Sequence, residues 1–177
     1  MFFFNRIMIV IEKEIHFEPS SYTNNEIIIK ILDKNNINDY INNYNINYIK
    51  YYCKKGAICL AAFKNNICVG YQFWTQDNNF KDLKQLELTL KDDEVYMFDF
   101  FVFPEYRGTK IPKIITRESL NYLSSNGINK IYGFYFSDNI KAAWWHKSYL
   151  KCTEIKHVKI HKVLFFEFAN GRLMLNM

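Results

Sequence analysis

The sequence lacks paired cysteines and any recognisable zinc-binding pattern. Its four cysteines include no Cys-x-x-Cys pair, and no secretory signal precedes them. Cysteines used in this way are typical of reduced, mostly buried thiols in a cytoplasmic protein. His157 and His161 are four residues apart, but we expect no nearby carboxylate or cysteine to complete a zinc site with them. We therefore expect a cytoplasmic protein that holds no metal ion.

Clusters of positive charge and long hydrophobic runs are also missing. The formal net charge of +5 is mild, and Lys and Arg are scattered along the chain. No basic helix or RNA-binding signature is present, so we expect no nucleic-acid partner. The apolar N-terminal stretch is interrupted by Asn5 and Arg6 and is too short to cross a bilayer. We therefore expect no stable membrane association.

Internal repeats and long linkers are absent as well. A chain of 177 residues has the size of one domain with a small addition. We expect a single domain over 1–177, with an N-terminal extension at 1–26 that forms an added strand or a hydrophobic arm. Residues 2–11 and the tail from Gly171 are apolar enough to pair with another subunit, which would give a homodimer.

The hydrophobic pattern predicts a mixed α/β fold. Strands are expected at 27–32, 57–63, 67–75, 94–103, 130–136, 152–159 and 163–168, and helices at 35–52, 111–123 and 138–148. The hairpin in the first half requires antiparallel strands, whereas strand, helix, strand in the second half implies a parallel pair. The prediction is a mixed central sheet of about six to seven strands flanked by helices, with an extra N-terminal strand.

The turn after the long aromatic strand at 94–103 is the most informative segment for chemistry. Pro104 ends the strand, and the sequence EYRGTKIP then leads directly into a helix. N–H groups at a helix start have no intrahelical partner and the helix dipole is positive there, so such a turn suits an anion such as pyrophosphate. Gly108 allows unusual backbone angles, while Arg107 and Lys110 add positive charge. Taken alone, the turn also fits an ordinary strand-to-helix connection with solvated basic residues.

Two segments together resemble the GNAT family of N-acetyltransferases. The run VFPEYRG at 102–108 resembles the family's acetyl-CoA-binding motif, and DNIKAAWWH at 138–146 resembles its second motif, an Asn followed by a helix. The predicted order of elements is similar to the family's. The resemblance implies a GNAT-like acyl-CoA N-acyltransferase fold, acetyl-CoA as co-substrate and direct attack of a primary amine on the thioester.

The resemblance implies an enzyme without identifying its acceptor. We expect the amine of a small molecule, with an amino sugar favoured. Tyr71, Phe73, Trp74 and Phe80 indicate an aromatic acceptor site, which suits sugar rings, apolar side chains or a longer acyl group equally. Two other interpretations stay open. One is an acetyltransferase that acts on a protein amine, and the other is a GNAT-like module that binds acyl-CoA or another ligand without turnover.

The cofactor contacts implied by the resemblance come from the end of the strand, the turn and the next two helices. Backbone groups of Val102 and Phe103 would hold the pantetheine arm, and backbone groups of 107–112 would hold the pyrophosphate. Asn139 would bond to the arm or cap its helix. The full implied set is Phe101, Val102, Phe103, Arg107, Gly108, Thr109, Lys110, Ile111, Pro112 and Asn139.

The chain departs from the family's motifs at several positions. Lys110 and Pro112 occupy the positions where the family's loop has glycines. Pro112 removes one N–H donor, which the ammonium of Lys110 could offset, and proline is tolerated in the first turn of a helix. His146 replaces the family's tyrosine, and Leu150 and Lys151 replace a Gly-Phe pair.

Three residues are candidates for proton transfer. Asp99 lies within an aromatic strand, where burial would favour its protonated form and suit a general base; the alternative is a structural Asp bonded to a neighbour. His146 could protonate the leaving thiolate as an imidazolium, or it could simply pack beside Trp144 and Trp145. Tyr149 would be the acid instead if the helix register differs by one turn.

Overall fold

A computed structural model describes residues 3–17, 26–38, 47–163, 166–169 and 172–174. The strands are β1 (Phe3–Glu14), β2 (Ile28–Leu32), β3 (Ile58–Lys64), β4 (Ile67–Thr75), β5 (Glu94–Val102), β6 (Lys130–Phe136), β7 (Thr153–Val163), β8 (Phe166–Ala169) and β9 (Arg172–Met174). The helices are α1 (Asn47–Lys54), α2 (Lys81–Leu86), α3 (Ile111–Ser125) and α4 (Ile140–Trp144), the last continued by a π-helical turn at Trp145–Tyr149.

The described strands form one mixed sheet with the order β2-β3-β4-β5-β6-β1-β7-β8-β9. Every neighbouring pair is antiparallel except β5 and β6, which are parallel. The predicted mixed α/β class is confirmed, and the described residues form nine strands, where about six to seven and an extra N-terminal strand were expected. The β3–β4 hairpin turns through Asn65 and Asn66, which both have positive φ, as tight hairpins require.

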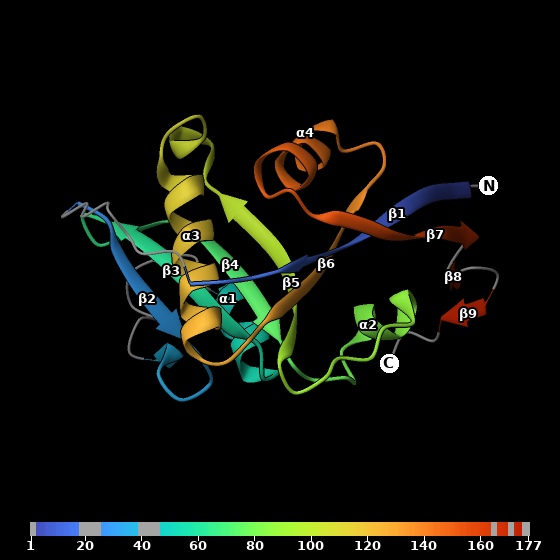
Figure 1. The fold of residues 1–177 in the computed structure, drawn as a ribbon, viewed down its shortest axis with the longest axis horizontal. Coiled ribbons are helices and arrows are strands. Elements are labelled where there is room, and N and C mark those ends of the chain that lie inside the picture. The colour runs from blue at the N-terminus through green and yellow to red at the C-terminus, as the bar shows by residue number, and fades with distance from the viewer. Residues whose placement is uncertain (1–2, 18–25, 39–46, 164–165, 170–171, 175–177) are drawn as a thin grey trace.

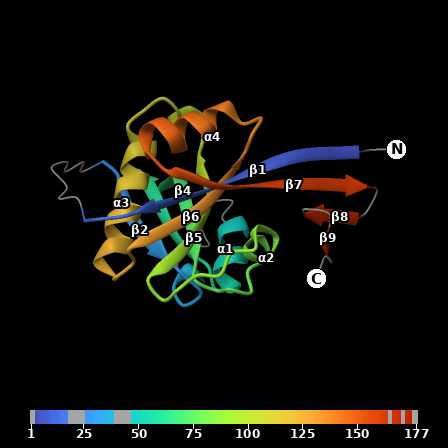
Figure 2. The ribbon, with the colours of Figure 1, turned by 45° about the vertical axis from the view of Figure 1, so that its right-hand side comes forward.

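The N-terminal strand lies inside the sheet and not at its edge. β1 pairs with β6 on one side and with β7 on the other, and Figures 1 and 2 show it running between these two strands. Met8 and Val10 are fully buried by this arrangement. Both edges of β1 are paired within the same chain from Met8 to Glu12, whereas the residues before Met8 pair with β7 alone, and the expected homodimer stays a prediction.

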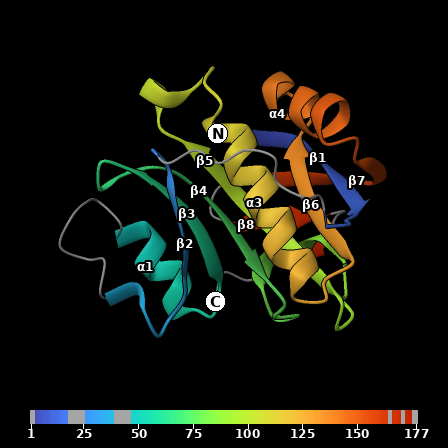
Figure 3. The ribbon, with the colours of Figure 1, turned by 60° about the vertical axis from the view of Figure 1, so that its left-hand side comes forward.

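Neighbouring residues of a strand point to opposite faces of the sheet, and on β3 both sets are buried, so each face is covered by a helix. On β3, Leu60 contacts the core cluster that includes Ile115 of α3, whereas Cys59 contacts the cluster that includes Ile49 of α1. We call these the α3 face and the α1 face. Figure 3 shows α3 and α4 next to each other, and the Lys113 ammonium lies 5.5 Å from the ring centre of Tyr149.

Two expected elements have different bounds in the structure. The helix expected at 35–52 is seen as α1, Asn47–Lys54, and residues 39–46 of that prediction lie outside the described residues. The strand break expected near His161 is wrong, because β7 continues to Val163 in register with β1. The thiols follow expectation: all four cysteines are free, and Cys53, Cys59 and Cys68 are buried.

Candidate active site

The central feature of the site is a gap between β5 and β6. These parallel strands pair only at their beginnings, and the last pair joins Tyr96 to Tyr132. No later pair joins them within the described residues, although β5 continues to Val102 and β6 to Phe136. The two strands therefore separate toward their carboxyl ends, the edge at which α/β sheets usually bind ligands.

A β-bulge shapes β5 beside this gap. On β4, Tyr71 pairs with Phe101 and Phe73 pairs with Phe98, so that Gln72 alone faces two residues of β5, Asp99 and Phe100. Asp99 has a φ of 54°, which non-glycine residues seldom adopt. The buried amide of Gln72 donates to the Phe98 carbonyl at 2.8 Å and to the Phe73 carbonyl at 3.0 Å, and so satisfies backbone groups at the bulge.

The bulge sends Asp99 to the α1 face and Phe100 to the α3 face. Asp99 accepts a hydrogen bond from the hydroxyl of Tyr48 on α1. Phe100 stacks on Trp145, with ring centres 5.5 Å apart. Our expectation that Asp99 is buried is wrong: its side chain is exposed, because the extra residue in the bulge breaks the alternation that would have placed it in the core.

The turn between β5 and α3 is held together by its own side chains. The Nε of Arg107 donates to the Val102 carbonyl at 2.9 Å, and its guanidinium lies 5.5 Å from the ring centre of Phe101. The hydroxyl of Thr109 donates to the Tyr106 carbonyl and accepts from the Ile111 N–H at 3.2 Å. Gly108 has a φ of 75°, in the left-handed region where glycine is favoured.

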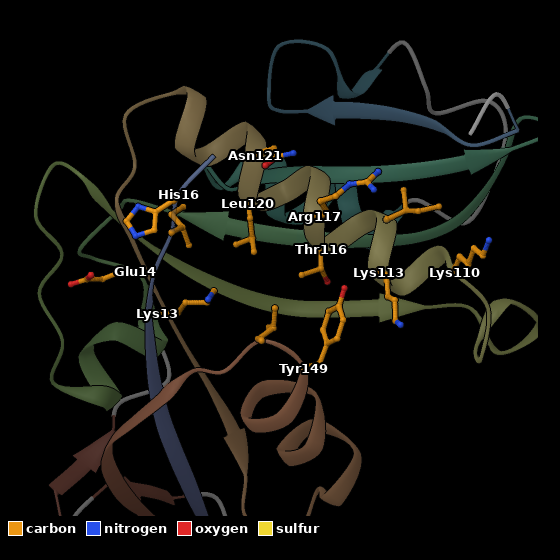
Figure 4. A pocket seen from close by; sticks show the side chains of 13 residues that line it. Lys13, Glu14, His16, Lys110, Lys113, Thr116, Arg117, Leu120, Asn121 and Tyr149 are labelled. Atoms are coloured by element: carbon orange, nitrogen blue, oxygen red, sulfur yellow. The ribbon is translucent and has the colours of Figure 1, made fainter. Parts of the chain in front are cut away.

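A cavity of about 620 Å³ lies on the α3 face, beside α3. One wall runs from Lys110, the residue before α3, along α3 to Asn121, and the opposite walls are Tyr149 and the end of β1. Figure 4 shows Lys110 and Lys113 at one end and the ring of Tyr149 pointing toward Thr116. The full lining is Lys13, Glu14, Ile15, His16, Lys110, Lys113, Ile114, Thr116, Arg117, Leu120, Asn121, Tyr149 and Leu150. Positive side chains outnumber negative ones there, which suits an anionic ligand.

The helix at 140–149 brings Tyr149, and not His146, to this cavity. The side chain of Asn139 caps α4 by accepting from the Ala142 N–H at 3.1 Å. The π-helical turn that follows adds a residue to the turn of the helix. As a result Tyr149 lines the cavity and packs on Trp145, while the ring of His146 stacks on Tyr135 of β6.

No family model matches the chain, and no curated protein matches its sequence. Its fold does match solved structures. A GCN5-related N-acetyltransferase from Sphaerobacter thermophilus is similar over 97% of this chain and 54% of its own, with a TM-score of 0.59 and 10% identity. One from Kribbella flavida covers 90% of this chain and 58% of its own, with a TM-score of 0.53 and 8% identity. An aminoglycoside acetyltransferase from an uncultured soil metagenomic sample is similar over 70% of this chain and 87% of its own, with a TM-score of 0.51 and 13% identity.

The chain has the GNAT fold. At these identities the likeness concerns the fold alone. The chain spans little more than half of the length of the first two structures. The fold that we inferred from residues 102–108 and 138–146 is therefore supported by solved structures.

Two of the backbone groups expected to hold the pantetheine arm already have partners in this GNAT fold. The Val102 carbonyl accepts from Arg107, and the Phe103 N–H donates to the Val69 carbonyl at 3.1 Å. The start of α3 also lacks backbone donors for a ligand, because the Ile111 N–H is bonded to the Thr109 hydroxyl and Pro112 has no N–H. Two of the donors that a helix start normally offers are thus unavailable, and the side chains of Lys110 and Lys113 supply the positive charge instead.

The role of His146 as an imidazolium acid does not fit its surroundings. Burial lowers the pKa of His146 from 6.5 to about 4, so the ring is neutral at pH 7. Its Nδ1 is buried and has no hydrogen-bond partner among the residues that the structure describes. Of the two expected acids, Tyr149 is the one that lies at the cavity.

The aromatic acceptor site expected from β4 is only partly present. Phe73 and Trp74 are core residues, exposed by 0% and 2%. Phe80 packs against Phe98 with ring centres 4.7 Å apart. Tyr71 is the member of this group that lies near Asp99, stacked on Phe101.

Sequence reasoning missed three residues that shape the site. Tyr48 and Gln72 contact the bulge from α1 and β4, and Lys113 lies one turn after Lys110 on the cavity side of α3. Only Lys113 had a local signal, since residues three apart share a helix face.

In the described part of the chain, no three His, Cys, Asp or Glu side chains come together as a metal-binding group. The described residues also contain no helix with the length and apolar character needed to pass through a bilayer.

Proposed function

We propose that this chain is an N-acetyltransferase that moves an acetyl group from acetyl-CoA to a primary amine of a small molecule. The main support for this proposal is that the gap between β5 and β6 lies between a basic cavity and an exposed carboxylate. A basic cavity lies on the α3 face, and the carboxylate of Asp99 lies on the α1 face beside the bulge. A thioester that enters the gap from the α3 face would meet an amine that arrives from the α1 face.

Lysine side chains, and not backbone N–H groups, would bind the phosphates of acetyl-CoA. Lys110 and Lys113 lie at one end of the cavity, where the first turn of α3 has lost two N–H donors. Arg117 follows on the same wall of the cavity, and Glu118 forms an ion pair with it at 2.7 Å. The two lysines would therefore provide most of the attraction for the phosphates of acetyl-CoA, and binding should weaken as salt screens their charge.

The proposed reaction is direct transfer. The carboxylate of Asp99 accepts a proton from the ammonium form of the substrate, and the lone pair of the resulting neutral amine attacks the thioester carbonyl. The C–N bond forms, the C–S bond breaks, and the hydroxyl of Tyr149 donates a proton to the departing thiolate. Burial of the thioester in the gap would strengthen the interaction of its sulfur with the Tyr149 hydroxyl.

Calorimetry with acetyl-CoA tests the proposal. We expect the wild type to bind and the Lys110→Ala/Lys113→Ala double variant to bind at least tenfold more weakly. Lys54→Ala is the matched control, because Lys54 is an exposed lysine on α1, on the other face of the sheet. Absence of binding to the wild type at millimolar acetyl-CoA would overturn the proposal.

Turnover separates the enzyme from a module that only binds. Free-thiol release should depend on an added amine, and Tyr149→Phe should lower kcat while leaving acetyl-CoA affinity within about twofold. Tight binding with no thiol release across a panel of primary amines would favour the non-catalytic module instead. The unusual start of α3, with Thr109 bonded to Ile111 and proline at position 112, is the feature that gives this alternative weight.

A further inference from the structure

The Asp99 cluster is a group of side chains on the α1 face of the sheet. It consists of Asp99, Tyr48, Tyr52, Tyr71 and Phe101. The ring of Tyr48 lies 4.9 Å from that of Tyr52 and 6.3 Å from that of Tyr71, and Tyr71 stacks on Phe101 at 5.5 Å. Asp99 is exposed, and so is Tyr48, which retains 45% of its accessible surface. The cluster is thus a carboxylate bordered by aromatic rings and open to solvent.

Asp99 is the one charged side chain among the five members of this cluster. No Lys, Arg or His forms an ion pair with Asp99 within the described residues, and Arg107 lies on Phe101, bonded to the Val102 carbonyl. Burial first, and then the neighbouring Asp99 carboxylate, raise the pKa of Tyr71. Burial and the hydrogen bond to Asp99 likewise raise the pKa of Tyr48. Both hydroxyls therefore stay protonated and can act as donors.

Tyr48 determines how Asp99 can meet a ligand. Its hydroxyl bonds to Oδ2 of Asp99. The other oxygen, Oδ1, takes part in no hydrogen bond in the part of the chain that the structure describes. One carboxylate oxygen is therefore positioned by α1, and the other is available to an incoming donor.

We propose that the Asp99 cluster selects the acceptor as an organic ammonium ion with an apolar or ring-shaped body and no carboxylate. This inference rests on the proposed function, and it names the acceptor class for the same site. A cation gains from Asp99 and from the faces of the tyrosine rings. A carboxylate on the same ligand would be repelled by Asp99 at close range. Amines such as tyramine should therefore bind better than amino acids such as tyrosine.

The test is binding of tyramine and of L-tyrosine, measured by calorimetry without acetyl-CoA. The two ligands differ only in the carboxylate, so their ratio of affinities reports its repulsion. We expect tyramine to bind the wild type at least tenfold more tightly, and Asp99→Asn to reduce that ratio to about twofold. Asn tolerates positive φ, so Asp99→Asn should keep the bulge, and an unchanged melting temperature would verify this. Tyr71→Leu should weaken tyramine by about fivefold through loss of the ring.

Asp92→Asn is the matched control, because Asp92 is an exposed aspartate outside the cluster. It should retain the full preference for tyramine. Equal or tighter binding of L-tyrosine by the wild type would overturn the inference, and so would a preference that survives in Asp99→Asn. Because these measurements need no turnover, an active enzyme that prefers L-tyrosine would refute only the acceptor class. A protein that binds tyramine selectively but never transfers acetyl would refute only the proposed reaction.

Discussion

The hydroxyl of Tyr48 donates a hydrogen bond to the carboxylate of Asp99, a residue 51 positions later in the sequence. This contact joins α1 to the bulge of β5, at the point where β5 and β6 separate. It fixes the direction of the only carboxylate of β5 that is exposed on the α1 face, among the residues that the structure describes. Tyr48 therefore acts on the proposed reaction through the position of Asp99, and not by contact with the acetyl group.

Replacement of Tyr48 by Phe removes this hydrogen bond and keeps the ring that packs on Tyr52. A hydrogen bond to a charged group contributes about 1.5–3 kcal/mol, so we expect kcat/KM for the amine to fall by about tenfold or more. The affinity for acetyl-CoA should not change. Tyr51→Phe is the control, because Tyr51 is exposed on the same helix. Equal kinetics for Tyr48→Phe and wild type would show that Asp99 needs no positioning.

Burial of His146 makes the stability of the protein depend on pH. The pKa of His146 falls from 6.5 to about 4 on folding, so the unfolded chain binds the proton more readily. Stability is therefore complete above pH 6.5 and decreases as the pH falls toward 4. The expected loss at pH 5 is about 2 kcal/mol, which urea unfolding at pH 7.5 and pH 5 would measure.

The variant His146→Phe keeps a ring stacked on Tyr135 and removes the titrating group. We expect its urea midpoint to change less between pH 7.5 and pH 5 than that of the wild type, by the equivalent of about 2 kcal/mol. His157→Gln should retain the wild-type dependence, because His157 is an exposed histidine whose side chain keeps 62% of its accessible surface. If His146→Phe and wild type respond equally to acid, burial of His146 is not the source of the effect.

Much of the fold could be predicted from the sequence because its signals are local. The aromatic strand at 94–102, the hairpin through Asn65 and Asn66 and the helix that ends before Gly127 each depend on residues close in sequence. The fold class follows from the order of such elements. A strand near the N-terminus was also predictable, but its insertion between β6 and β7 was not, because pairing partners far along the chain leave no local pattern.

The site was harder to predict because it depends on departures from regular geometry. The bulge at Asp99 is specified partly by Gln72 on a different strand, whereas the aromatic residues around Asp99 predicted a regular strand with Asp99 in the core. A single π-helical turn decides whether His146 or Tyr149 faces the cavity, and helical periodicity assumes that no such turn exists. Motif resemblance located the right segments, and the orientation of side chains within them required the structure.

The amide of Gln72 stabilises the bulge, and its removal should affect both stability and activity. Gln72→Met has a similar volume but leaves the Phe98 carbonyl without its donor, which should cost about 1–3 kcal/mol. Loss of the bulge would also turn Asp99 away from the α1 face, so kcat/KM for the amine should fall. Gln76→Met is the control, since its amide donates to the Asp92 carbonyl at an exposed position. A Gln72→Met protein with wild-type stability and activity would contradict this role.

Asn139 is the residue for which capping and cofactor contact can be separated experimentally. Its side chain accepts from the Ala142 N–H, so Asn139→Ala should lower the free energy of unfolding by about 1 kcal/mol. Serine also caps helices but is shorter than asparagine and lacks its amide donor. We expect Asn139→Ser to restore stability while it binds acetyl-CoA about fivefold more weakly than wild type. Denaturant unfolding and calorimetry on the same samples would separate the two effects, with Asn126→Ala as an exposed control. If Asn139→Ser regains wild-type affinity as well as stability, the cap alone explains the asparagine, and the cofactor contact implied by the family resemblance is absent.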